Sequence, residues 1–420
     1  GGSVARNTAN SYVISAPGHY RIPLVYGNAI KTGATNANAY ISHAATGNSN
    51  VLYNFQDHAG HAIDDPWIEK TNGGANSGVD GAEVVWADAA NLVHSPSITH
   101  VGGEGFLDFE VTAADIQSGN AVVAVTKGSG GSKTVLWSWH LWFAPKDALD
   151  KIKVTNHQNV DYYFTKEALG WKPTQWSSST YSSARIVKVK VEQTVANNGT
   201  KQDAVINITQ KPGRVWKGVT TLYQFGRKDA FPGVDALAAN SHFTKDAGDN
   251  MSIMNGIQHP DKFYTHAGGS SWQNNYSYYN LWSADNTTTG HNDNPVVKTV
   301  YDPCPVGFKM PASNAFTGFT ANGQDEGTMN VDGTGNSLTY DNNSGHNFWT
   351  SSSKTATIYF PISGYHGYSG WQYNDDRGYY WLAVPRDKID GNLLYFRSTD
   401  VHPLNFNGRP SGYAVRPVSE

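Results

Sequence analysis

Two β-rich segments near the middle of the first half of the chain flank a glycine-rich run. Ala121–Lys127 has the sequence AVVAVTK, Thr134–Phe143 has the sequence TVLWSWHLWF, and Gly128–Ser132 (GSGGS) lies between them. β-branched and aromatic residues favour strands, and the glycines favour a turn. Alternation in the second segment places four apolar side chains on one face: Val135, Trp137, Trp139 and Leu141. The pattern predicts a β-hairpin with a buried, tryptophan-rich face.

Further strands are predicted on both sides of this hairpin. Before it lie β-branched and aromatic segments at Ser11–Ile14, Tyr20–Tyr26, Ala82–Trp86 and Phe106–Val111. About seven short strands before a junction near residue 148 are typical of an Ig-like β-sandwich. After the junction, Ala184–Val191 and Ala204–Gln210 surround Asn197-Asn198-Gly199 and predict a second hairpin. Its outward lysines are expected to protect an exposed edge.

Composition excludes several classes of protein. Of 420 residues, 16% are charged and 12% are aromatic, and the chain holds 43 glycines and 18 prolines. Too few charges and too many apolar residues are present for a disordered chain, and the Ala/Glu/Lys/Leu bias of helical bundles is missing. A net charge of −4 argues against a nucleic-acid partner, and no apolar run is long enough for a membrane span. The single cysteine, Cys304, allows no intrachain disulfide.

Catalytic and metal-binding signatures are weak. The chain has no P-loop, no H-E-x-x-H and no G-x-S-x-G, so we expect no enzymatic activity. Three stretches hold oxygen or imidazole ligands: Asp57–Asp65, Asp285–Asn294 and Asp325–Asp341. The sequence matches no EF-hand register, and Asn, Asp and Gly are common in turns. We therefore predict no cofactor and leave structural calcium as an alternative.

Aromatic residues gather between Gly364 and Trp381 among Gly, Ser, Asn and Asp. The stretch includes Tyr365, His366, Tyr368, Trp371 and Tyr373. Tyrosine and tryptophan provide large contact areas at low entropic cost, and Ser, Gly and Asn adapt by hydrogen bonding, as in antibody paratopes. The alternative is an aromatic core beneath loops. We interpret the stretch as a binding surface.

Several segments resemble surface proteins of gut Bacteroidales. The segments Asn10–Lys31 and Leu136–Trp142 resemble the N-terminal module of fimbrillin-like adhesins. The segments Leu222–Pro232, Asp302–Pro311 and Gly412–Val418 are similar to their C-terminal domains. The resemblance implies a C-type lectin-like α+β domain with long loops behind the β-sandwich. The Glu-Pro-Asn and Trp-Asn-Asp motifs of calcium-dependent lectins are missing, which puts calcium-mediated sugar recognition in doubt.

A final stretch, Leu394–Ser411, looks like a variable region on such a scaffold. Relatives often carry asparagine at several of these positions, and diversity-generating retroelements mutate the adenines of asparagine codons. The residues that look like replacements are Tyr395, Arg397, Asp400, His402, Phe406, Gly408 and Ser411. The framework would be held by Phe396, Val401, Pro403, Arg409 and Val415. Ordinary drift is the alternative explanation.

Together these observations predict a mainly β protein with a sandwich domain at 1–148 and a C-type lectin-like domain at 149–420, unless the boundary lies near 212. The resemblance implies an extracellular cell-surface adhesin, the tip subunit of a fimbrium, joined to a neighbouring pilin by strand addition. The start Gly1-Gly2-Ser3 is consistent with an export signal already removed. The alternatives are an outer-surface protein that binds or degrades polysaccharide, and a structural shaft pilin.

The receptor, a protein or glycan on a host or bacterial surface, would bind one face of the second domain. The residues expected on that face are Tyr365, His366, Tyr368, Trp371, Tyr373, Tyr395, Arg397, Asp400, His402, Phe406, Gly408 and Ser411.

Overall fold

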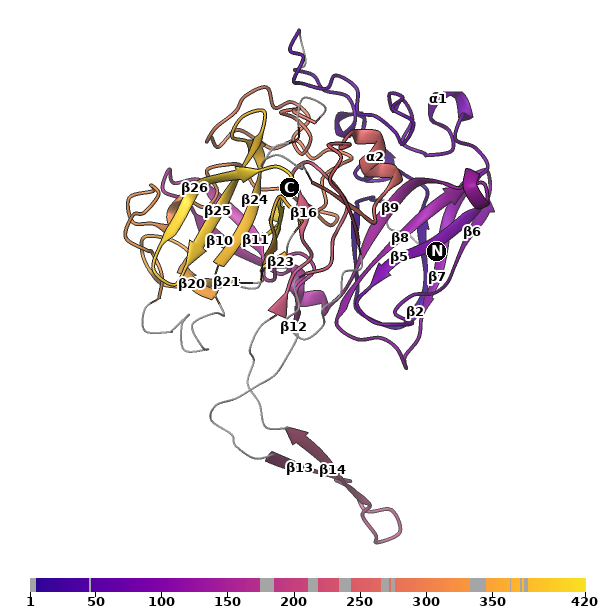
Figure 1. The fold of residues 1–420 in the computed structure, drawn as a ribbon. Helices are drawn as coiled ribbons and strands as arrows, with labels where there is room; N and C mark the ends of the chain where they lie inside the picture. Colours follow the sequence, from indigo (N-terminus) through magenta and orange to yellow (C-terminus); the bar gives the residue numbers. More distant parts are fainter. Residues whose placement is uncertain are drawn as a thin grey trace.

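A computed structural model of the chain contains the hairpin predicted from residues 121–143 (Figure 1). The structure describes residues 5–44, 47–173, 185–210, 218–233, 243–265, 272, 276–332, 345–362, 364–370, 372–373 and 377–420. These residues form a mainly β protein with several sheets. Within these ranges, no helix is long and apolar enough to cross a membrane.

Two sheets make up the N-terminal half, on the right in Figure 1. The first has the strand order β1-β9-β8-β5, with β1 at Ser11–Ile14, β5 at Gly81–Ala87, β8 at Gly119–Lys127 and β9 at Thr134–Phe143. The second has the order β2-β7-β6, with β2 at Gly18–Pro23, β6 at His94–Val101 and β7 at Glu104–Val111. The predicted strands of this half are present, although the strand expected at Tyr20–Tyr26 is found at Gly18–Pro23, and β6 was not predicted. Buried residues of both sheets belong to one apolar core.

Both faces of β9 are buried, although its alternating pattern predicted one buried face. Trp137 and Trp139 pair in register with Val125 and Val123. Leu136 and Trp142 are equally inaccessible. The reason is that α2 (Ile253–Gln258) of the C-terminal half also contacts β9. A strand covered on both sides loses its polar face, as strands of doubly covered sheets do.

Small sheets build the C-terminal half. The largest antiparallel unit is β24-β25-β26, at Arg377–Pro385, Asp390–Arg397 and Val401–Gly408. Beside it lies the sheet β16-β27-β22-β23, with β16 at Tyr223–Gln224, β22 at Tyr365–His366, β23 at Gln372–Tyr373 and β27 at Gly412–Tyr413. A third sheet, β10-β11-β28-β19, has strands at Lys151–Thr155, Asp161–Thr165, Val418–Ser419 and Phe308–Lys309.

The remaining elements are short pairs and turns. The paired strands are β3 Ile30–Lys31 with β4 Ala34–Thr35, β12 Lys172–Pro173 with β15 Gly218–Val219, β13 Arg185–Glu192 with β14 Asp203–Gln210, β17 Thr244–Asp246 with β18 Lys262–Tyr264, and β20 Gly345–Trp349 with β21 Thr357–Pro361. The helical turns are α1 Thr71–Gly74, η1 Ala37–Ala39, η2 Gly130–Ser132, η3 Lys146–Leu149 and η4 Thr317–Phe319.

Buried contacts cross the predicted domain junction near residue 148. The Asn10 amide donates to the carbonyls of Val300 and Asp302 at 2.6 and 2.8 Å, and the Trp86 indole donates to the carbonyl of Ala230 at 2.9 Å. The larger apolar cluster contains side chains from both halves. The boundary itself stays a prediction, but the two halves share one core.

Candidate functional site

Strand register lines up five aromatic rings on one side of the C-terminal sheets. Tyr365 pairs with Tyr373 across β22 and β23, Tyr379 pairs with Tyr395 across β24 and β25, and Tyr395 pairs with His402 across β25 and β26. Residues that face each other across neighbouring strands project from the same side, so their rings meet. We call this row, Tyr373-Tyr365-Tyr379-Tyr395-His402, the tyrosine ladder.

Each ring of the tyrosine ladder contacts the next. The centroid distances along the row are 4.7, 4.7, 5.0 and 5.1 Å. Tyr373 lies nearly parallel to Tyr365, at an interplanar angle of 12°. These distances fall within the range in which aromatic pairs attract each other beyond simple burial. The ladder is thus a continuous ring-to-ring contact across five strands.

A buried aromatic layer supports the middle of the ladder. Tyr413 stacks on Tyr379 at 4.5 Å and 10°, and Trp381 contacts Tyr413 at 4.7 Å. The Trp381 indole donates to the carbonyl of Tyr223 at 2.7 Å, which fixes the ring. The middle rings are therefore held by the core, since Tyr365 and Tyr379 are both buried. Burial also raises the pKa of Tyr379 well above its usual value, so its hydroxyl stays protonated.

Solvent reaches the ladder at Tyr373, whereas at the other end the His402 side chain is 14% exposed and the neighbouring Arg397 is 45% exposed. Tyr373 is 40% exposed at one end, and Tyr368, in the turn between β22 and β23, is 43% exposed. At the other end, the His402 imidazole lies 3.2 Å from an Asp400 carboxylate oxygen, and the Arg397 guanidinium donates to Asp400 at 2.6 Å. The exposed aromatic end can contact the flat face of a ligand, and the exposed Arg397 can contact a polar group.

Hydrogen bonds hold the Asp400 carboxylate in its ionised form. Partial burial opposes ionisation, but donation from Arg397 and Thr399 outweighs it and lowers the pKa of Asp400. The same contact raises the pKa of Arg397. The Arg397 side chain is 45% exposed, so solvent screens the pair and its contribution to stability is small.

The Arg397–Asp400 pair predicts a measurable titration. A carboxylate whose pKa is lowered on folding stabilises the native state above its unfolded pKa and loses that contribution as pH falls through the folded pKa. We expect the Asp400 carboxyl carbon to titrate in NMR with a midpoint below about 3.9, the usual Asp value. Arg397→Gln should move the midpoint upward. An unchanged midpoint in the variant would show that Arg397 does not hold the carboxylate.

Of the residues predicted on the binding face, the structure brings six together: Tyr365, Tyr373, Tyr395, Arg397, Asp400 and His402. Tyr368 lies in the adjoining turn, and Trp371 falls outside the described residues. Tyr379 completes the row but was missing from the prediction. Its alternation with Arg377 and Trp381 indicates a shared face, but no local pattern shows which strand pairs beside it.

Besides Tyr365, which is buried within the tyrosine ladder, three predicted residues lie in the interior. His366 is inaccessible, lies between Phe243 and Phe263, and has its pKa lowered by burial to about 4. Gly408 and Ser411 are also buried. A ligand on the surface cannot reach these side chains without unfolding, so we leave them out of the proposed face.

Phe406 lies apart from the ladder. It is 44% exposed and pairs with Asn392. Asn392 lies three residues before Tyr395 on β25, and residues separated by an odd number of positions point to opposite sides of a strand. By register Phe406 therefore projects from the opposite side of β25. The Arg386 guanidinium lies 4.5 Å from its ring centroid. This exposed pair is separate from the tyrosine ladder.

Metal ligands do not assemble in the described ranges, where no cluster of three or more His, Cys, Asp or Glu side chains is positioned for an ion. In the first candidate stretch, the buried Asp57 carboxylate already accepts from the backbone amides of Ala59 and His61 and from the side chains of Asn72 and Asn76. Part of the third stretch, residues 333–344, falls outside the described residues.

No family model, no curated protein and no solved structure matches this chain.

Proposed function

We propose that the chain is a cell-surface adhesin, the tip subunit of a fimbrium, that binds a receptor through the tyrosine ladder. The observation that carries the proposal is the continuous row of five rings, open to solvent at Tyr373 and ending in the Arg397–Asp400–His402 group. The exposed rings at its end, Tyr373 and the neighbouring Tyr368, can stack on sugar rings or on apolar protein side chains while the buried rings hold Tyr373 in place, and the guanidinium adds directional donors. Tyrosine and arginine are the residues most enriched at binding hot spots.

A C-type lectin-like fold of the second domain is part of this proposal. The distribution of burial in that domain supports a fixed framework with replaceable surface residues. The framework residues Phe396, Val401, Pro403, Arg409 and Val415 are all buried. Arg409 donates to the carbonyls of Tyr278 and Asp387, both at 2.7 Å, and so ties three segments together. Tyr395, Arg397, Asp400 and His402, by contrast, are exposed or half-buried. These four side chains can vary with little cost to the fold, as retroelement-driven diversity would require, whereas the buried Gly408 and Ser411 do not fit this pattern.

A groove in the N-terminal half supports attachment to a neighbouring pilin. It has a volume of about 530 Å³ and lies between β1 and β2, each of which is the edge strand of its sheet. Its lining is mainly apolar and includes Tyr12, Val13, Tyr20, Phe106 and Phe109. An extended segment can pair with an edge strand through its backbone while its side chains fill such a groove. The groove thus suits strand addition from another subunit.

An adhesin binds its ligand without cleaving it, whereas a polysaccharide-degrading protein releases soluble sugar, so the two functions can be separated by experiment. Beads coated with the full chain should bind saturably to a defined set of arrayed glycans or to intact epithelial or bacterial cells. The same mixtures should release no reducing sugar, because the proposed site holds its ligand by stacking alone. Release of soluble sugar would support the enzyme instead, and failure to bind any of these surfaces would contradict the adhesin.

A further inference from the structure

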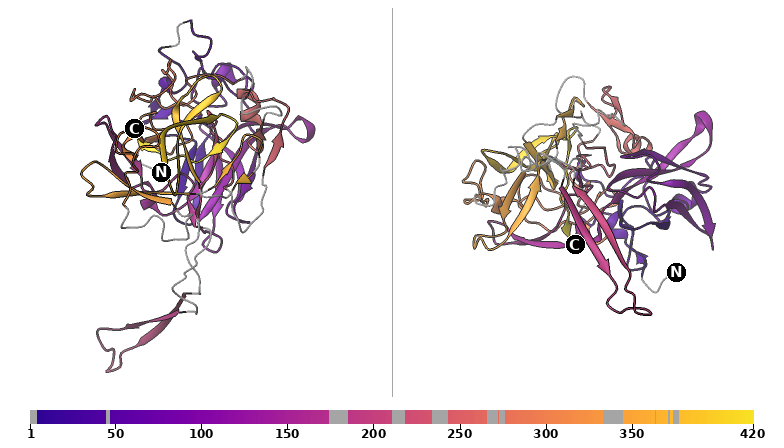
Figure 2. Two further views of the ribbon diagram at one scale, coloured as in Figure 1. Left: turned by 60° about the vertical axis from the view of Figure 1, so that its left-hand side comes forward. Right: turned by 90° about the horizontal axis from the view of Figure 1, so that it is seen from below.

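The β13–β14 hairpin is a two-stranded ribbon that stands clear of the rest of the molecule in two orientations (Figures 1 and 2). Its eight residue pairs run in unbroken register from Arg185 opposite Gln210 to Glu192 opposite Asp203. No other strand among the described residues joins this sheet. A two-stranded ribbon is marginally stable in water unless an apolar face is covered.

The middle of one face of the ribbon is apolar, and by register the Arg185–Gln210 pair follows on the same face at one end. Three cross-strand pairs form the apolar strip: Val187 with Ile208, Val189 with Ile206, and Val191 with Ala204. Val187 is 59% exposed and Ile208 56%, and even Val189 at the centre is 39% exposed. An ordered apolar strip of this kind, accessible along its whole length, is typical of a protein interaction site.

The opposite face carries the ion pairs, together with the exposed Ile186 and Val205. Lys190 forms ion pairs with Asp203 at 2.8 Å and with Glu192 at 3.1 Å, and Lys201 lies 3.8 Å from Glu192. These groups neutralise one another and suit contact with water. The strip of three apolar pairs is therefore the part of the ribbon best suited to a partner, and that partner must be apolar where it covers the strip.

A second copy of the same face meets these requirements. The three apolar pairs are arranged symmetrically about Val189 and Ile206, so a two-fold axis across the ribbon places apolar pairs on apolar pairs and brings the two copies of Val189 together. The pair then contains four strands in two layers, and each ribbon covers the apolar strip of the other. An isolated ribbon has no such cover. Because the rotation reverses the ribbon, the two copies run in opposite directions along the shared face.

The size of the face sets the strength of the contact. Eight residues per strand span about 26 Å, and two strands are roughly 10 Å wide with their side chains. Stacking two such faces removes on the order of 500–1,000 Å² of accessible surface, at or below the low end for specific interfaces. We propose that two copies of this chain associate weakly and reversibly through the apolar faces of their β13–β14 ribbons. The contact uses no residue of the tyrosine ladder.

Cysteine cross-linking tests this stacking. Val189→Cys places a thiol on the apolar face, and the matched control Lys188→Cys places one on the charged face of the same strand. The native Cys304 is buried and stays unreactive. Under mild oxidation, the full chain with Val189→Cys should form disulfide-linked dimers at least about tenfold faster than the control, because stacking raises the effective concentration of the thiols. Equal rates in the two variants would overturn the proposal.

Sedimentation velocity provides a second readout that needs no new thiol. The unmodified chain should shift from monomer to dimer as its concentration rises, and Ile206→Lys should abolish the shift by placing a charge on the apolar face. A chain that stays monomeric throughout would overturn the proposal, as would species larger than a dimer, since these indicate open, head-to-tail association. Receptor binding by Ile206→Lys should remain unchanged, which separates this outcome from a failure of the ladder.

Discussion

Replacing Asp229 by alanine is expected to lower the free energy of unfolding by about 3–5 kcal/mol, the cost of removing one partner from a buried ion pair. One carboxylate oxygen of Asp229 accepts from Arg227 at 2.9 and 3.2 Å, and the other accepts from Lys228 at 2.7 Å and from Ser138 at 3.0 Å. The side chains of the three charged residues are at most 2% exposed. Without the carboxylate, two cations remain buried with no counter-ion.

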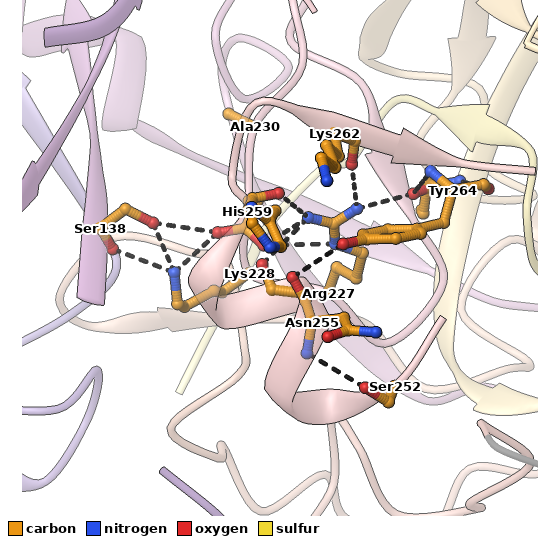
Figure 3. A network of polar contacts seen from close by, with 12 residues as sticks. Ser138, Arg227, Lys228, Ala230, Ser252, Asn255, His259, Lys262 and Tyr264 are labelled. Atoms are coloured by element: carbon orange, nitrogen blue, oxygen red, sulfur yellow. Dashed lines mark hydrogen bonds and ion pairs between the residues drawn. The ribbon is translucent and has the colours of Figure 1, made fainter. Parts of the chain in front are cut away.

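The pKa directions agree with this picture. Burial alone would raise the pKa of Asp229, but the adjacent Lys228 and Arg227 charges lower it, so the carboxylate stays ionised. Burial lowers the pKa of Lys228. The cluster also joins distant segments (Figure 3). Lys228 reaches Ser138 on β9, while Arg227 donates to the carbonyls of Lys262, Gly256 and His259 around α2.

Urea unfolding of the full chain measures the Asp229→Ala effect. The matched control is Asp147→Ala, since Asp147 pairs with Lys166 on the surface with both side chains about half exposed. A surface pair contributes about 0–1 kcal/mol, so the control should unfold almost as the parent does. A loss below about 1 kcal/mol for Asp229→Ala would show that the buried cations find other partners.

Replacing Tyr373 and Tyr395 together by alanine is expected to weaken receptor binding by roughly 100-fold or more, because hot-spot rings contribute about 2 kcal/mol or more each. Tyr373 provides the exposed end of the ladder, and Tyr395 connects Tyr379 to His402 and the charged end. Their removal breaks the row at two places. Binding should be measured at equilibrium on the surface that the bead and array experiments identify.

The control for this pair is Tyr163→Ala. Tyr163 lies on β11, is 43% exposed, and is no part of the ladder. This variant removes a tyrosine ring that is about as exposed as the ring of Tyr373. Thermal unfolding should show that Tyr373→Ala alone changes stability little, because its ring is partly in solvent. Equal losses of binding in Tyr163→Ala and the ladder variant would contradict a localised site.

Local patterns in the sequence predicted the strands well, and the arrangement of the site poorly. Segments such as Thr134–Phe143 and Arg185–Glu192 can be predicted as strands from their own β-branched and aromatic residues. The ladder instead depends on which strands pair, and in which register, between Tyr365 and His402. Pairing between separate segments is a tertiary property that local periodicity does not encode.

Adjacent residues show the same limit. Tyr365 and His366 have similar chemistry and lie in the same glycine-rich stretch, yet strand alternation places Tyr365 in the ladder and His366 beneath it against Phe243. The β13–β14 ribbon also shows that local sequence does not predict what covers a strand. Its outward lysines were expected to protect an exposed edge, and nothing local showed that the apolar strip on the other face would lack a cover among the described residues.

Footprinting tests the central claim, that the tyrosine ladder is the receptor-binding surface, most directly. Hydroxyl-radical labelling of the full chain, free and bound to the receptor-bearing surface, reports the accessibility of each exposed ring. Tyr368, Tyr373 and Tyr395 should be protected on binding, whereas Tyr163 and Phe406 should be labelled equally in both states. Protection of Tyr163 or Phe406 with the ladder still fully labelled would place the binding site elsewhere and contradict the proposal.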